Sequence, residues 1–109
     1  MDLFTALAGF IEPVMVTIEP YAGSGGTKPL YAAGVPVGSI VEQKRRLVRD
    51  PQGREVTSET TVYVPLATAC PDASRITLPD GQVTTVITVS IHRAHGNTEL
   101  PEHLEIACV

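Results

Sequence analysis

The 109-residue chain contains no tryptophan, and its aromatic content is only 5%. Proteins that bind single-stranded nucleic acid stack bases on aromatic side chains, so this composition offers little material for such a platform. There are only two cysteines, Cys70 and Cys108, far apart in a chain without a secretory signal. We expect two buried thiols in a protein made inside the cell, with a bond between them as the alternative.

Charged residues are also scarce, at 18%, and acidic residues outnumber basic ones to give a formal net charge of −4. This balance argues against a protein whose main task is to neutralise phosphates. Long hydrophobic runs are missing as well. The apolar first residues lack the basic start of a signal peptide, and Glu12 and Pro13 end them well short of a membrane span. We expect no contact with a membrane.

Glycine and proline, by contrast, are plentiful, with nine of each. Together with many β-branched residues they predict short strands separated by turns. The length fits one domain, and the pattern predicts an all-β fold over residues 12–109, as a small antiparallel barrel or sandwich. Residues 1–11 are predicted to be an arm with a short helical segment. This arm either covers one end of the core or docks on a neighbouring subunit.

Four short strands are predicted at residues 14–19, 74–78, 82–91 and 104–109. Residues 22–34 follow the first of them and contain four glycines and no acidic residue, which predicts a flexible loop. A loop this long in a small domain is typically functional or disordered. The candidate functional residues of this loop are Gly23, Ser24, Gly25, Gly26, Thr27 and Lys28.

Residues 35–65 predict a long β-hairpin. Asp50, Pro51 and Gly53 have the order of a type I turn followed by a glycine bulge. Placing Asp50 opposite Arg54 keeps opposite charges together, whereas a shift by one residue opposes like charges. The favoured register predicts the pairs Arg49 with Glu55, Val48 with Val56, Arg45 with Glu59, Val41 with Tyr63 and Ile40 with Val64.

Five of the eight basic residues lie between residues 44 and 54. A basic run of this density first suggests a nucleic-acid contact. The predicted register instead pairs two of the five, Arg45 and Arg49, with glutamates on the opposite strand. It leaves Lys44, Arg46 and Arg54 without partners, and these three are candidates for a protein interface in which charge sets the docking orientation.

Signatures of catalysis are absent from the sequence. There is no nucleophile motif of the Gly-x-Ser-x-Gly kind, and the glycine-rich loop lacks the Gly-Lys-Ser/Thr ending of a phosphate-binding loop. His92, His95 and His103 are the only cluster with the character of metal ligands. Because zinc needs about four converging ligands and these histidines fall at a strand end and in a loop, we predict no metal, no cofactor and no enzymatic activity.

Three stretches together resemble one protein family: residues 44–50 with Gly53, residues 55–66, and residues 100–106. They are similar to the head-to-tail stopper proteins, also called head-closure or head-completion proteins, of long-tailed (siphovirus-type) phages, particularly those that infect actinobacteria. The resemblance covers most of the chain from Val35 onward. It consists of whole strands and contains no catalytic signature.

The resemblance implies a structural virion protein located in the neck, with the host cytoplasm as its place of assembly. Such subunits form a cyclic ring of roughly six or twelve copies below the portal and its adaptor. The ring retains the packaged double-stranded DNA, which passes through it without sequence-specific binding, and it offers a docking surface to the tail terminator or tail tube. A loop in the channel acts as a gate, and the 22–34 loop is the candidate here.

Three other functions remain open at this stage. The chain could be a tail-terminator or minor tail ring protein, since those assemblies also use small β-rich subunits. A small nucleic-acid-binding barrel would use the basic run as its footprint, and it would need unpaired cations with stacking aromatics. A metal-dependent hydrolase would use the histidines, and about one bound zinc per chain would favour it.

Overall fold

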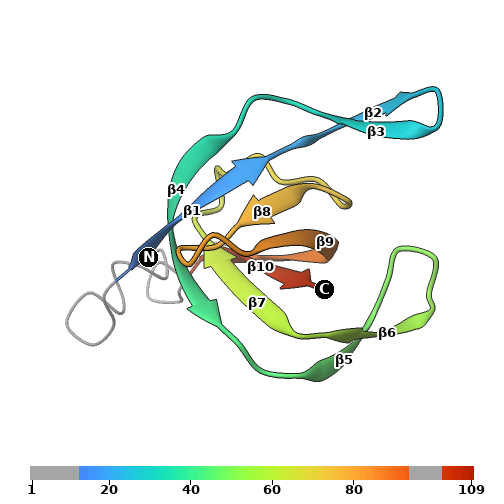
Figure 1. Cartoon of the computed structure of the whole chain (residues 1–109). Coiled ribbons are helices and arrows are strands. Elements are labelled where there is room, and N and C mark those ends of the chain that lie inside the picture. Colours follow the sequence, from blue (N-terminus) through green and yellow to red (C-terminus); the bar gives the residue numbers. More distant parts are fainter. Residues whose placement is uncertain (1–12, 94–101) are drawn as a thin grey trace.

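The computed structural model describes residues 13–93 and 102–109, and they fold into a closed six-stranded antiparallel barrel (Figure 1). The strand order is β1-β4-β7-β10-β9-β8, and β8 pairs with both β1 and β9 to close the barrel. Its strands are β1 (Val14–Glu19), β4 (Val35–Glu42), β7 (Thr60–Val64), β8 (Arg75–Thr77), β9 (Val83–His92) and β10 (His103–Cys108). The predicted all-β class is confirmed, and the barrel is observed in place of the sandwich.

The helical segment predicted for the N-terminal arm lies outside the described residues. Within residues 13–93 and 102–109, no helix is long and apolar enough to cross a membrane.

Two separate hairpins project from the barrel as arms (Figure 1). The first consists of β2 (Tyr21–Gly25) and β3 (Lys28–Tyr31), and the second of β5 (Arg46–Arg49) and β6 (Glu55–Ser58). Most of residues 22–34, which were predicted to form a loop, therefore lie in the strands and turn of this first hairpin. Gly23 and Gly26 have positive φ angles of 101° and 73°, so glycine here permits the bulge and the tight turn of a hairpin.

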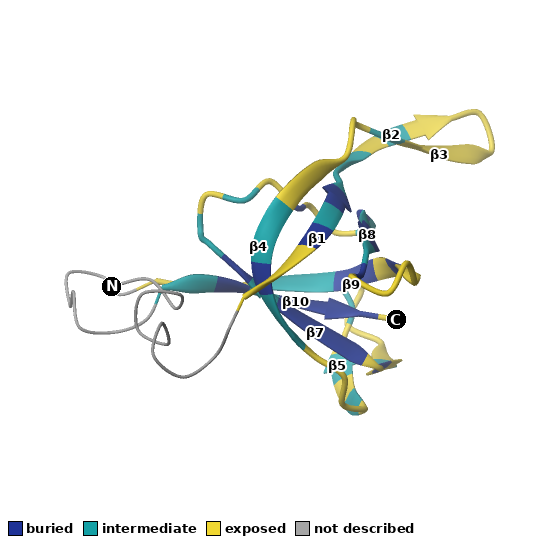
Figure 2. Ribbon diagram, turned by 60° about the vertical axis from the view of Figure 1, so that its left-hand side comes forward, coloured by how far each residue is buried: buried dark blue, intermediate teal, exposed yellow. Residues whose placement is uncertain are grey.

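The core fills the inside of the barrel. Successive residues of a strand point to opposite faces, so alternate residues of β1, β7 and β10 face inward. Figure 2 shows this burial along the barrel strands, with exposed residues along the β2–β3 arm. The buried core residues are Val16, Ile18, Val62, Val64, Cys70, Ile76, Leu78, Val86, Leu104, Ile106 and Cys108.

Both cysteines are buried in this core and are free thiols, as predicted. Burial raises the pKa of Cys70 to about 11 and the pKa of Cys108 to about 12, because the apolar surroundings disfavour the thiolate. The thiolate is the reactive form of cysteine. The two side chains therefore serve as small apolar core residues at neutral pH.

The register predicted for the second hairpin is confirmed near its turn and wrong beyond it. Val48 lies opposite Val56 and Arg49 opposite Glu55. The Asp50 and Arg54 backbones hydrogen-bond across the turn. Further along, however, Val41 pairs with Val62 and Ile40 with Tyr63, one residue away from the prediction.

The shift arises at the junction between the hairpin and the barrel. Three residues lie between Glu42 and Arg46, whereas two lie between Ser58 and Thr61, so the first arm carries one extra residue. An extra residue of this kind makes a β-bulge, which bends the strand. On the opposite arm the Ser58 hydroxyl donates to the backbone carbonyl of Cys108 at 2.8 Å, which ties the junction to β10. The bulge therefore turns the second hairpin out of the barrel wall.

Candidate functional site on the projecting hairpins

The base of the β2–β3 hairpin is fixed to the barrel by an aromatic and ionic cluster. Tyr21 and Tyr31 lie opposite each other with their rings edge to face, 6.3 Å between centroids. The Arg75 guanidinium lies 4.4 Å above the Tyr31 ring and forms a two-point ion pair with Glu19, at 2.6 and 3.1 Å. The hydrogen bonds from Arg75 hold the pKa of the Glu19 carboxyl below its usual range. The arm thus leaves the barrel from an ordered base.

The tip of this arm carries the residues predicted to form a gate. Ser24, Gly25, Gly26, Thr27 and Lys28 are all exposed. Ser24 pairs with Pro29 and Gly25 with Lys28, which leaves residues 26 and 27 as the turn. A Cβ on Gly25 would lie only 3.2 Å from the Leu30 side chain, so glycine lets this leucine fold over the backbone. The tip is a narrow projection of small side chains with one positive charge.

On the second hairpin the two predicted cross-strand ion pairs are present. Arg45 Nε donates to Glu59 Oε1 at 3.0 Å, and Arg49 Nη2 lies 3.6 Å from Glu55 Oε1. All four side chains are largely exposed. Exposed pairs of this kind each contribute at most about 1 kcal/mol, so they organise the surface more than they stabilise it.

The three cations predicted to be unpaired do not form one free patch. Arg54 Nε lies 3.0 Å from Asp50 Oδ2, and this carboxylate also accepts backbone hydrogen bonds within the turn. The hydrogen bonds from Arg54 and Gln52 lower the pKa of Asp50. Arg46 Nη2 lies 2.7 Å from Glu105 Oε1. Among the described residues only Lys44 of the three makes no ion pair, so the prediction was wrong for Arg46 and Arg54.

This difference gives a test by charge reversal. Lys44→Glu is expected to change the free energy of unfolding by less than about 0.5 kcal/mol, because the side chain is exposed and forms no ion pair with any residue of 13–93 or 102–109. Arg46→Glu is expected to lower the free energy of unfolding by about 1–2 kcal/mol, because the new carboxylate would lie against the carboxylate of Glu105 on β10. Urea unfolding of both variants measures the difference. Equal losses would contradict the inward pairing of Arg46.

The outer face of the second hairpin presents an apolar side chain between charges. Leu47 is 69% exposed and lies opposite Thr57. The Arg49–Glu55 pair on β5 and β6 flanks it on one side, and the Arg45–Glu59 pair, just beyond these strands, flanks it on the other. An apolar centre with a polar rim is the usual composition of a protein–protein contact. Sequence reasoning treated this hairpin only by its charges and did not single out Leu47.

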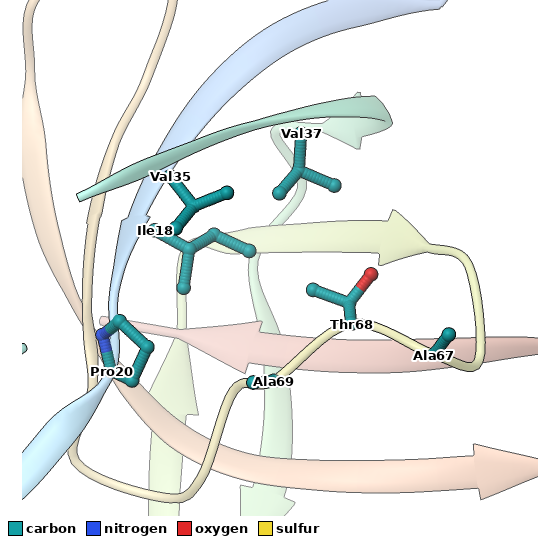
Figure 3. Close-up of a pocket in the computed structure, with 7 residues that line it drawn as sticks. All are labelled: Ile18, Pro20, Val35, Val37, Ala67, Thr68 and Ala69. Atoms are coloured by element: carbon teal, nitrogen blue, oxygen red, sulfur yellow. The ribbon is translucent and has the colours of Figure 1, made fainter. Parts of the chain in front are cut away.

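A shallow apolar pocket lies at the base of the β2–β3 arm. Ile18, Val35 and Val37 come from β1 and β4 and lie opposite the loop that carries Thr68 (Figure 3). Its volume is about 270 Å³, which is below the range of about 300–1,000 Å³ that is usual for small-molecule sites. Pro20, Ala67 and Ala69 complete the lining, which contains no titratable side chain. The pocket suits an apolar side chain and has no group for acid–base chemistry.

Polar side chains gather on the outside of β7, β9 and β10. His92 and His103 are cross-strand partners, and their rings stack in parallel with 4.5 Å between centroids. His92 Nε2 lies 3.1 Å from Glu105 Oε2, and the Tyr63 ring lies 5.7 Å from that of His103. Burial and the charge of Glu105 raise the pKa of Tyr63.

Sequence reasoning had grouped His92 and His103 with His95, which lies outside the described residues. The structure joins the first two to Glu105, which the sequence analysis did not include. The pairing of the last two strands identifies Glu105 as a member of this cluster. Once His92 is placed opposite His103, Glu105 lies on the same face two residues further along β10. The order of strands in the sheet was needed to find it.

Comparisons with known proteins leave the family open. No protein-family model matches the chain, and no curated protein matches its sequence significantly.

Proposed function

We propose that this protein is a head-to-tail stopper subunit, a virion protein that forms a ring below the portal and adaptor of a long-tailed phage. In this role the ring holds the packaged DNA in the head and provides the surface on which the tail docks. The observation that carries the proposal is a small closed barrel with a glycine-tipped arm anchored at its base. An anchored arm of this kind suits a gate that must extend into a channel.

The stretches that resemble stopper proteins are neighbours in the fold, which supports the proposal. Residues 44–50 and 55–66 include both strands of the second hairpin and β7, and residues 103–106 of the third stretch lie in β10. β7 pairs with β10 along its length. The resemblance therefore falls on one contiguous part of the fold, as expected where a family shares a structural element.

The β2–β3 tip is the proposed gate. Small side chains at residues 23–27 allow several copies of the tip to approach one another near the axis of a ring. Lys28 adds one positive charge to an otherwise uncharged tip, in a chain of net charge −4. A channel lined by subunits of this charge holds DNA by blocking it sterically, and weak affinity for phosphate lets the genome leave at ejection.

Leu47 and its flanking ion pairs are the proposed contact with a neighbouring subunit or with the adaptor. The exposed leucine supplies apolar area, while the two ion pairs and Lys44 set the orientation of docking. This assignment replaces the free cationic patch expected from the sequence.

The nucleic-acid alternative makes an opposite prediction for heparin. Four of the five cations of residues 44–54 have a carboxylate partner within 4.0 Å. We therefore expect the purified protein to pass through a heparin column at about 150 mM salt, because few positive charges are available to release counterions. Retention at that salt concentration, with elution that depends steeply on salt, would favour a nucleic-acid-binding barrel instead.

Cryo-electron microscopy of the neck of the virion that encodes the chain tests the proposed position. Density for this barrel in a ring between the adaptor and the tail would support the stopper assignment. Density at the end of the tail tube would favour the tail-terminator alternative, and density in neither ring would refute both.

A further inference from the structure

The outer face of the barrel brings three metal-binding side chains together. His103 and Glu105 lie two residues apart on β10 and therefore share a face, and His92 lies opposite His103 on β9. The candidate ligand atoms of these three residues all lie within 4.8 Å of one another. All three side chains project from paired strands, so the backbone that positions them is fixed by the sheet.

We propose that His92, His103 and Glu105 bind a divalent transition-metal ion, with Zn²⁺ as the best match. Two imidazoles and one carboxylate form a ligand set that zinc takes in proteins, where a fourth position stays open to water or to an outside ligand. Harder ions such as Mg²⁺ prefer sites made only of oxygen. The proposal stands on the geometry of this face and is independent of the proposed role in the virion.

Binding requires a small rearrangement of the two rings. Zinc bonds to nitrogen at about 2.0–2.1 Å, so the donors of a tetrahedral site lie roughly 3.4 Å apart. The two imidazoles now stack with only 7° between their planes. A metal lies in the plane of each imidazole that binds it, so the rings must turn out of the stack. The side chain of His92 is 45% exposed and has room to do so.

The carboxylate is already oriented for such a role. Arg46 Nη2 holds Glu105 Oε1 at 2.7 Å, and Oε2 faces His92 Nε2 at 3.1 Å. Carboxylates that bind metals are commonly fixed by a hydrogen bond to their second oxygen. Zinc would replace the hydrogen bond between His92 and Glu105, and Glu105 would bind it through Oε2 alone. The charge of Arg46 limits the affinity, so we expect dissociation constants in the micromolar range.

Calorimetric titration of the full-length, tag-free protein with ZnCl₂ at about pH 7.5 tests the site. We expect about one zinc per chain, and a rise in the melting temperature of about 10 °C at a hundredfold excess over the dissociation constant. His92→Gln and Glu105→Gln should each weaken binding at least about tenfold. Asp80→Asn removes an exposed carboxylate from the turn between β8 and β9, at the end of β9 opposite His92, and should bind as the unaltered protein does.

His92→Gln is the decisive variant, because an exposed side chain can be replaced without loss of the fold, which the melting curve without metal verifies. Nuclear magnetic resonance of the imidazole nitrogens supplies a second readout: zinc should shift the signals of His92 and His103 together. No saturable binding at millimolar zinc would overturn the proposal. So would binding that His92→Gln leaves unchanged, since the ion would then be held elsewhere.

Discussion

Particles assembled with a shortened β2–β3 arm are expected to lose their packaged DNA, so that most heads are empty. The change replaces residues 23–29 with Asn-Gly, a pair that favours the tight turn of a two-residue hairpin. It removes the exposed tip and leaves Tyr21 opposite Tyr31, with Arg75 above the Tyr31 ring. Counting DNA-filled heads by electron microscopy, and measuring nuclease-protected DNA, gives the result.

The length of the arm, and not its sequence, is expected to matter for retention. A matched variant keeps the full length of the arm and replaces Thr27 and Lys28 with serine, which removes the charge without shortening the hairpin. This variant should retain DNA as the unaltered protein does. The barrel should melt at the same temperature in both variants, because the tip residues are exposed. If particles with the short arm still hold DNA and join tails normally, the gating role is refuted.

The sequence predicted correctly those parts of the fold that are determined by residues close together in the chain. The Asp50-Pro51-Gln52-Gly53 turn set the register of the second hairpin as far as Arg45 and Glu59. The bulge at the junction was not predicted, because a single extra residue there changes the local free energy little. It is favoured only by the way in which the hairpin strands join the barrel. The error of one residue at Val41 and Ile40 follows from it.

The fate of the basic residues depended on contacts between distant strands. Arg46 finds its partner on β10, nearly sixty residues further along the chain. A register argument can assign partners only within one hairpin, so Arg46 appeared free.

The glycine-rich segment was predicted to be a loop for a different reason. Gly23 and Gly26 indicate backbone freedom, which loops and tight hairpins both require, and composition alone does not separate the two.

The largest loss of stability is expected from Ile106→Ala, at about 3–4 kcal/mol of unfolding free energy. Ile106 is fully buried in the core. It lies on β10 between Val62 of β7 and Val89 of β9, where truncation leaves a cavity that neighbouring strands cannot easily fill. Since small domains have only about 5–15 kcal/mol of total stability, urea unfolding should show a clearly lower midpoint.

Ile91→Ala makes the same chemical change on the neighbouring strand. Ile91 is 57% exposed, so its truncation should cost less than about 1 kcal/mol. The comparison tests whether β10 is a central strand of a closed barrel, because the two isoleucines lie on the same face of the sheet and differ chiefly in burial. Similar losses for both variants would contradict the closed arrangement. A large loss for Ile106 alone would show that β10, which carries both Glu105 and His103, is held from both sides, as a rigid metal site requires.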